Sequence, residues 1–301
     1  MNPPDGSCGP SMRETQQMHL NIRKLFHILE WGGMMSMIFG AKELKLEVQD
    51  MVFDYITFGK GTKPLVMIQG LNTRGIKGAA ISLAYMYRIF AKDFQVYLFD
   101  RRPVIHEGMT VSDMASDIAM AMDALGITNA SIFGVSQGGM IAQYLAMERP
   151  DLVKRLVLAV TLARNNDTVK RVVNNWIGLA EQGSMKELVA DMAEKMYSDA
   201  YIKRYRPLIP LLTILQKPKD VRRFVILAKA CLTCNTYDTL EKINCPVLVL
   251  GGRKDQVVTG VASEEIAEKL GCKIHMYDDL GHAAYEESKD FNQIVYDFFR
   301  E

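Results

Sequence analysis

The sequence lacks the features that mark several classes of protein. Its 301 residues carry a formal net charge of +1 and contain no long run of one charge sign, so nothing in the charge favours nucleic-acid binding. The most apolar early stretch, residues 34–41, is far shorter than the roughly 20 residues of a membrane span. It also lacks the layout of a signal peptide. We therefore expect a cytoplasmic protein with no membrane span and no nucleic-acid partner.

Cysteine is also scarce. The five cysteines are an odd number and are loosely scattered, which does not suggest a disulfide framework. Cys231 and Cys234 form a lone C-x-x-C, and no second pair or nearby histidine completes a zinc site. We expect buried thiols, no metal and no cofactor, with a metal or redox role as the weaker alternative.

Residues 1–41 are predicted to be an extension. Residues 1–10 are rich in Pro and Gly and indicate a disordered start. Ser11 to Glu14 fits a capping box, and apolar residues then recur at helical spacing as far as Gly32. This helix either packs on the main body or lies on a partner or membrane surface. The methionines near residue 35 are alternative starting points for the chain.

From residue 42 onward, strand-like segments alternate with helical ones. Two early strands are predicted over residues 44–48 and 52–58. Continuous apolar runs follow at 64–68, 95–99, 130–133, 156–160, 246–250 and 273–277. Such runs are typical of strands buried on both faces, and their alternation with helices predicts an α/β fold with a mostly parallel sheet. We assign residues 42–161 and 241–301 to this core.

Residues 162–240 interrupt the alternation. They contain no convincing strand and show helical patterns near 167–180, 185–196 and 220–232. An all-helical insertion of this size in an α/β sheet predicts a cap or lid over the core.

One serine stands in a special setting. Ser136 lies between Gly134 and Gly138, after an apolar strand and before a helix that starts near Gln137. This is the strand–turn–helix context of a nucleophile elbow, in which side chains two positions on either side of the serine would clash. The pentapeptide alone is weak evidence, because G-x-S-x-G arises by chance in about one chain in ten of this length. The alternative is a plain glycine turn.

A serine hydroxyl needs a base, and the base needs an orienting carboxylate. His282 follows the last predicted strand, and Asp255 follows strand 246–250. Both positions lie after the carboxyl ends of strands, where open α/β sheets place their sites. His106 is a weaker candidate base. Asp278 and Asp279 are weaker candidate acids, because they share the loop of His282.

Acyl transfer also needs hydrogen-bond donors for the developing oxyanion. The backbone N–H of Gln137, the residue after the serine, would supply one. The loop after strand 64–68 would supply another, and Leu71 is the expected donor because Gly70 lets the backbone approach the substrate closely. We thus expect the catalytic residues Ser136, Asp255 and His282, with Leu71 and Gln137 forming the oxyanion hole.

These motifs together resemble the α/β-hydrolase superfamily, in particular its single-cap members such as 3-oxoadipate enol-lactone hydrolases, esterases and cofactor-free haloperoxidases. The chain order Ser–Asp–His agrees with that of the superfamily. The resemblance implies an α/β-hydrolase fold with a helical cap insertion. Two departures are Gln69-Gly70, where the family usually has His-Gly, and Pro103, where it usually has Gly. The matching segments are Tyr55, Gly59–Pro64, Gly134–Gly139, Ile141–Gln143, Asp238, Leu240, Ile243, Pro246, Asp255, Gly281, His282 and Glu286.

The leading functional hypothesis is a serine hydrolase that cleaves a small carboxylic ester, lactone or thioester through an acyl-enzyme. The alternatives are hydrolysis of a carbon–carbon bond in a β-diketone-like substrate, and a ligand-binding sensor that keeps the fold. The partner in each case is a small molecule. Gln69, Trp176 and Tyr197 are candidate pocket residues, although packing inside the cap explains the two aromatics equally well. Arg101 or Arg102 is a candidate for binding a substrate carboxylate.

Overall fold

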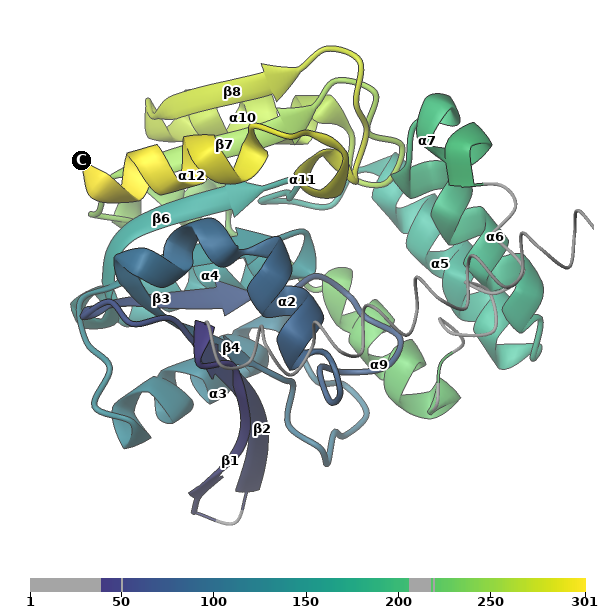
Figure 1. Cartoon of the computed structure of the whole chain (residues 1–301). Coiled ribbons are helices and arrows are strands. Elements are labelled where there is room, and N and C mark those ends of the chain that lie inside the picture. Colours follow the sequence, from purple (N-terminus) through teal and green to yellow (C-terminus); the bar gives the residue numbers. More distant parts are fainter. Residues whose placement is uncertain (1–38, 50, 206–217, 219) are drawn as a thin grey trace, which may run out of the picture.

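An eight-stranded sheet forms the centre of the protein (Figure 1). In this computed structural model, the described residues are 39–49, 51–205, 218 and 220–301, so the helix predicted to start at Ser11 lies outside them. The strands are β1 (Lys42–Val48), β2 (Met51–Phe58), β3 (Lys63–Ile68), β4 (Phe94–Phe99), β5 (Ala130–Val135), β6 (Val153–Ala159), β7 (Val247–Gly252) and β8 (Lys273–Tyr277).

The strand order is β1-β2-β4-β3-β5-β6-β7-β8. β2 pairs antiparallel with β1 and with β4, whereas all pairs from β4 to β8 are parallel. Each strand overlaps the segment predicted for it, and the predicted α/β fold with a mostly parallel sheet is confirmed.

Helices cover both faces of the sheet. The helices, including short 3-10 turns marked η, are α2 (Ala80–Met86), η1 (Arg88–Lys92), α3 (Val111–Ala124), α4 (Gln137–Glu148), η2 (Pro150–Leu152), α5 (Asp167–Glu181), α6 (Met185–Met196), α7 (Asp199–Tyr205), α9 (Val221–Cys231), η4 (Tyr237–Lys242), α10 (Gly260–Leu270), α11 (Ala284–Glu287) and α12 (Phe291–Arg300).

Strand β3 shows how the two faces are built. Successive side chains of a strand point to opposite faces. Val66 and Ile68 therefore join a core with α3, α4 and α10, while Leu65 and Met67 join a second core with α2 and α12. All four side chains are almost fully buried. This two-sided burial explains why the strand reads as one continuous apolar run.

The segment between β6 and β7 carries α5, α6, α7 and α9 and, within its described residues, no strand of the central sheet. A single bridge between Arg164 and Asn235 joins its two ends. Figure 1 shows α5, α6 and α7 gathered beyond the ends of the central strands, the side on which the loops after the strands lie.

The turn from β5 into α4 is tightly packed against β3. A Cβ atom added to Gly138 would lie 1.9 Å from the carbonyl oxygen of Ile68, and one added to Gly134 would lie 2.5 Å from the carbonyl oxygen of Gly138. Both obstacles are backbone atoms, which side-chain movement cannot relieve. Gly138 therefore lets the end of β3 meet the start of α4, and Gly134 lets β5 turn closely into α4.

We expect Gly138→Ala to lower the free energy of unfolding by about 1–3 kcal/mol or more, because the added methyl group forces the backbone of β3 and α4 apart. Gly178→Ala is the matched control. Gly178 lies within α5, with nothing within 4 Å of an added Cβ, so alanine there should raise stability by about 0.4–1 kcal/mol. Denaturant-induced unfolding of both variants checks this, and equal midpoints would contradict it.

Candidate active site

Ser136 occupies the turn between β5 and α4 with a left-handed backbone, φ 53° and ψ −119°. Such a conformation costs a non-glycine residue about 1–3 kcal/mol and persists only where neighbouring groups hold it. The Ser136 N–H donates to the carbonyl of Ala159 at 2.8 Å, and the Thr161 hydroxyl donates to the carbonyl of Ser136 at 2.7 Å. Sequence reasoning missed Thr161, since a threonine after an apolar strand is too common to stand out.

His282 lies between Ser136 and Asp255. Its Nε2 atom is 2.9 Å from the Ser136 Oγ, and its Nδ1 atom is 2.8 Å from the Asp255 Oδ2. With the ring proton on Nδ1, donated to the carboxylate, Nε2 is left to accept the serine proton. His282 and Asp255 are both buried. The structure therefore brings together the three side chains that the sequence singled out.

The Asp255 carboxylate is fixed by more than the histidine. Its Oδ1 accepts hydrogen bonds from the backbone N–H groups of Val257 at 2.7 Å and Val258 at 2.9 Å. The loops after β7 and β8 are also joined, because the Lys254 N–H donates to the carbonyl of Leu280 at 3.0 Å. These bonds hold the carboxylate and the imidazole in one orientation.

The weaker candidates for the acid and the base form their polar contacts with other residues. Asp278 pairs with Arg253 and Asp279 with Lys254, at 2.7 Å and 2.8 Å. His106 is exposed, and its Nδ1 lies 3.0 Å from the backbone oxygen of Glu107. None of these three contacts Ser136 or His282 through a hydrogen bond.

The loop after β3 lies directly beside Ser136. A Cβ atom added to Gly70 would be 3.2 Å from the Cβ of Ser136, and Leu71 lines the same cavity as Ser136. Gln137 is the first residue of α4, where backbone N–H groups have no intrahelical acceptor. Both backbone groups expected to bind an oxyanion thus lie next to the serine, and their role in catalysis stays a prediction.

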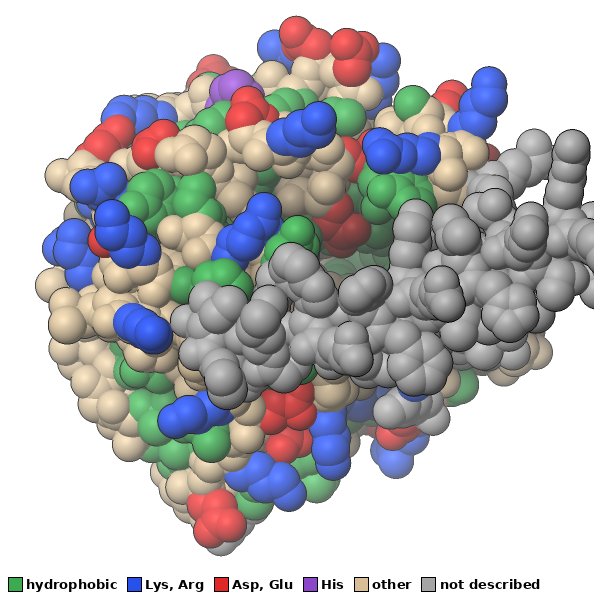
Figure 2. Space-filling view, viewed as in Figure 1, with side chains coloured by type: hydrophobic (Ala, Val, Ile, Leu, Met, Phe, Trp, Pro, Cys, Tyr) green, Lys and Arg blue, Asp and Glu red, His purple; other side chains and the backbone are tan. Residues whose placement is uncertain are grey.

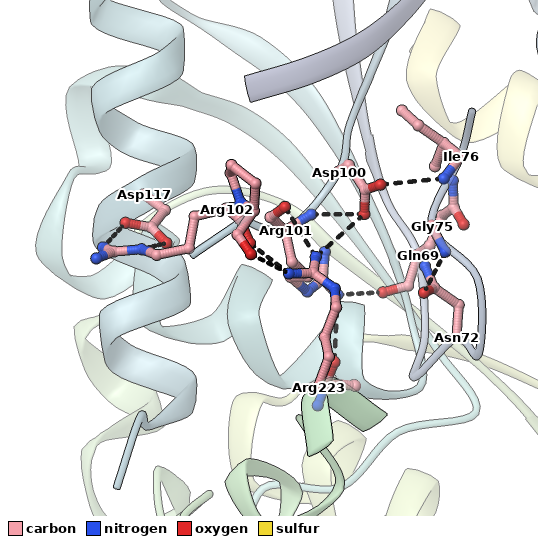
Figure 3. A network of polar contacts seen from close by, with 11 residues as sticks. Gln69, Asn72, Gly75, Ile76, Asp100, Arg101, Arg102, Asp117 and Arg223 are labelled. Atoms are coloured by element: carbon pink, nitrogen blue, oxygen red, sulfur yellow. Dashed lines mark hydrogen bonds and ion pairs between the residues drawn. The ribbon is translucent and has the colours of Figure 1, made fainter. Parts of the chain in front are cut away.

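A polar network behind this loop holds it in place (Figure 3). The buried Arg101 guanidinium donates to the carbonyl of Gln69 at 2.6 Å and to the side-chain oxygen of Gln137 at 3.4 Å. Burial lowers its pKa to about 10. Arg102 donates from Nε to Asp117 at 2.6 Å. The two arginines considered for a substrate carboxylate therefore bond to protein groups, and neither lines the cavity at Ser136.

That cavity is small and mostly apolar, with a volume of about 40 Å³. Trp176 forms part of its wall, and its indole N–H donates to Asp191 at 2.7 Å. The lining residues are Gly70, Leu71, Ser136, Met140, Val169, Val173, Trp176, Met192, Met196, Cys231, Val257, Val258, His282 and Tyr285. Trp176 thus belongs both to the packed interior and to the cavity wall.

A larger cavity of about 360 Å³ adjoins the small one. Gln69 and Tyr197, the other two candidate pocket residues, line this larger cavity and not the one at Ser136. The two cavities share Gly70, Leu71, Met192, Met196 and Tyr285 in their walls.

One member of the cysteine pair, Cys231, lines the cavity at Ser136. Cys231 and Cys234 are buried and free, and burial raises their pKa to about 11 and about 12. The side-chain nitrogen of Gln137 contacts the Cys231 sulfur at 3.1 Å. Among the residues that the structure describes, no cluster of three or more His, Cys, Asp or Glu side chains could hold a metal ion.

Within residues 39–49, 51–205, 218 and 220–301, no helix is long and apolar enough to cross a membrane.

Known proteins resemble this chain in sequence and in fold. Residues 63–200 match the family model for the alpha/beta hydrolase fold. The chain is 21% identical over 257 residues to 3-oxoadipate enol-lactonase 2 of Acinetobacter baylyi, covering 83% of this chain and 94% of that protein. It is 26% identical to a 2-hydroxy-6-oxononadienedioate/2-hydroxy-6-oxononatrienedioate hydrolase of Paraburkholderia xenovorans, covering 81% of this chain and 89% of the relative.

A solved structure agrees with these matches. The enol-lactonase from Burkholderia xenovorans LB400 superposes with a TM-score of 0.75 at 21% identity, covering 86% of this chain and all of the other. The strand order, the turn that carries Ser136, the matched model and the relatives agree on one assignment: the chain has the α/β-hydrolase fold and is a distant relative of these hydrolases.

Proposed function

We propose that the protein is a serine hydrolase that cleaves a small carboxylic ester, lactone or thioester through an acyl-enzyme. The observation that carries the proposal is the hydrogen-bonded chain from Ser136 Oγ through His282 to Asp255, with distances of 2.9 Å and 2.8 Å. A pure binding protein has no need of a serine held by a buried base and an oriented carboxylate.

The geometry suggests the following reaction. His282 Nε2 takes the proton of Ser136 as its Oγ attacks the substrate carbonyl, and the Asp255 carboxylate stabilises the imidazolium. The negative oxygen of the tetrahedral intermediate accepts hydrogen bonds from the backbone N–H groups of Leu71 and Gln137. His282 then protonates the leaving alcohol or thiol. Water, activated in the same way, releases the acid and restores the Ser136 hydroxyl.

The organisation of the chain is part of the proposal. Residues 42–161 and 241–301 would form the hydrolase core, residues 162–240 a helical cap, and residues 1–41 an extension. Helices α5 and α6 of the inserted segment contribute Trp176 and Met192 to the cavity at Ser136, which supports a role for the cap in substrate selection. A cytoplasmic location, expected from the sequence, belongs to the same proposal.

The alternative enzymatic activity to ester cleavage is hydrolysis of a carbon–carbon bond. One relative acts on 2-hydroxy-6-oxo diacids, and the name of another states a lactone substrate. Among the described residues, no arginine or lysine that would bind a carboxylate beside the reacting carbon lines the cavity at Ser136, so we favour the uncharged ester or lactone. A panel of p-nitrophenyl esters, lactones and β-diketones separates the two.

Ser136→Ala should abolish labelling by a fluorophosphonate and reduce ester hydrolysis by several orders of magnitude, because no other group replaces the nucleophile. Thermal unfolding should remain cooperative, since the hydroxyl contributes little to packing. Mass spectrometry of the labelled wild-type protein locates the adduct. An adduct on any other serine would refute the assignment.

Asp255→Asn should preserve folding but lower kcat by up to about four orders of magnitude, because the amide favours the wrong imidazole tautomer. Asp279→Asn is the matched control, since Asp279 is exposed and pairs with Lys254, and it should leave kcat within about twofold. Steady-state kinetics on one ester compares the two. Near-normal activity of Asp255→Asn would sink the assignment of the acid.

Trp176→Ala should shift preference toward longer acyl chains, because removing the indole enlarges the 40 Å³ cavity at Ser136. We expect the kcat/KM ratio of hexanoyl over acetyl p-nitrophenyl ester to rise about tenfold or more. Trp176→Phe keeps an aromatic ring while losing the bond to Asp191, and should leave the ratio nearly unchanged. Equal ratios in all three proteins would show that Trp176 does not limit the acyl group.

A further inference from the structure

Arg101 is an arginine in the interior of the protein. Lysine and arginine side chains ordinarily lie at the surface, as the blue groups on the face shown in Figure 2 do, whereas Arg101 is only 6% exposed. Burial lowers its pKa to about 10, which still leaves the guanidinium charged at neutral pH. Taking a charge out of water is costly unless hydrogen bonds compensate, so the partners of this guanidinium explain its place in the fold.

The guanidinium bridges segments that follow neighbouring strands. β3 pairs in parallel with β4 on one side and with β5 on the other, so the segments after these three strands leave the sheet at the same edge. Arg101 follows β4, Gln69 follows β3, and Gln137 begins α4 after β5. One guanidinium nitrogen donates to the carbonyl of Gln69 at 2.6 Å and to the side-chain oxygen of Gln137 at 3.4 Å. It therefore joins the two segments that carry the expected oxyanion donors.

The residue before Arg101 fixes the far end of the same loop. Asp100 accepts a hydrogen bond at Oδ2 from the backbone N–H of Ile76 at 3.1 Å, and at Oδ1 from the backbone N–H of Arg101 at 2.8 Å. Figure 3 shows Asp100 and Arg101 reaching the two ends of this loop, while Arg102 points the other way, toward α3. Residues 69–76 are thus held at both ends by two consecutive residues that follow β4.

The bond to the Gln69 carbonyl matters because a glycine follows it. A planar peptide leaves two soft dihedrals per residue, and glycine has the widest choice of both. Gly70 alone separates the Gln69–Gly70 peptide plane from the N–H of Leu71, and an added Cβ at Gly70 would lie 3.2 Å from the Ser136 Cβ. Fixing the first plane therefore limits where the Leu71 N–H can point. A hole that is oriented beforehand costs no reorganisation when the negative charge develops.

We propose that Arg101 is a positioning residue of the oxyanion hole. Its guanidinium holds the loop after β3 against the start of α4, so that the backbone N–H groups of Leu71 and Gln137 are directed to one place beside Ser136. The inference deepens the proposed function and rests on it. Arg101 does not line the cavity at Ser136, so it acts on the reaction through the loop and not through contact with the substrate.

The test compares two substrates that differ in the atom that becomes negative. p-Nitrophenyl acetate develops its charge on oxygen. p-Nitrophenyl thionoacetate, with C=S in place of C=O, develops it on sulfur, which is larger and a weaker hydrogen-bond acceptor, so an oriented hole favours the oxygen ester. Arg101→Met should lower kcat/KM for the oxygen ester about tenfold or more, while kcat/KM for the sulfur ester stays within about threefold. The preference for the oxygen ester should therefore fall in the variant.

A merely structural role of Arg101 predicts a different result. Displacement of Ser136 or His282 would slow both esters alike and leave the preference unchanged, and that result would overturn the inference. Arg102→Lys is the matched control, because the neighbouring arginine is bonded to Asp117 on α3 and not to the loop after β3. This control should keep the wild-type preference. An equal loss of preference in the control and in Arg101→Met would also count against the inference.

If Arg101→Met does not fold, Arg101→Lys takes its place. Lysine keeps the charge but is shorter and lacks the planar fork of the guanidinium, so the preference for the oxygen ester should fall several-fold, and an unchanged preference would contradict the inference. Hydrolysis of the oxygen ester by the wild type, with the same preference in the variant, would leave the proposed function standing and refute only the inference. If the wild type hydrolyses neither ester and no fluorophosphonate adduct forms at Ser136, both fail.

Discussion

The left-handed backbone at Ser136 is the constraint on which the site depends. Its φ of 53° directs the hydroxyl away from the sheet, and the sharp turn forces α4 to start against the end of β3. A Cβ on Gly138 would lie 1.9 Å from the carbonyl oxygen of Ile68, so the chain leaving β3 passes directly beside the serine. The proximity of Leu71 to Ser136 therefore follows from the turn, and the bond from Arg101 to the carbonyl of Gln69 fixes the loop there.

Hydrogen bonds join the inserted segment to the elements that carry His282, Gln137 and Arg101. The Ala283 N–H, next to His282, donates to the carbonyl of Met196 at the end of α6, at 2.8 Å. The Gln137 side chain donates to the carbonyl of Leu227 in α9 at 2.7 Å, and Arg223 donates to the carbonyl of Arg101 at 3.0 Å. A shift of these helices would therefore move the histidine loop and the walls of both cavities together.

The sequence predicted the sheet and the Ser136, Asp255 and His282 constellation because both depend on local signals. Buried parallel strands read as apolar runs, and reactive side chains follow their carboxyl ends. Thr161 and Glu286 could not be assigned their contacts from the sequence, because the partners of each are set by packing between distant elements. Gln69 and Trp176 were grouped as pocket residues, yet they line different cavities, since the sequence does not fix how a helix is rotated against the sheet.

The charged groups near the site differ in how they are held. Asp255 has His282 and two backbone N–H donors, and Arg101 lies beside Asp100. Glu286, by contrast, is exposed to solvent, and its carboxylate accepts a hydrogen bond from the Tyr197 hydroxyl at 2.6 Å. The fixed Asp255 carboxylate would favour the imidazolium that forms on His282 in the proposed acyl transfer.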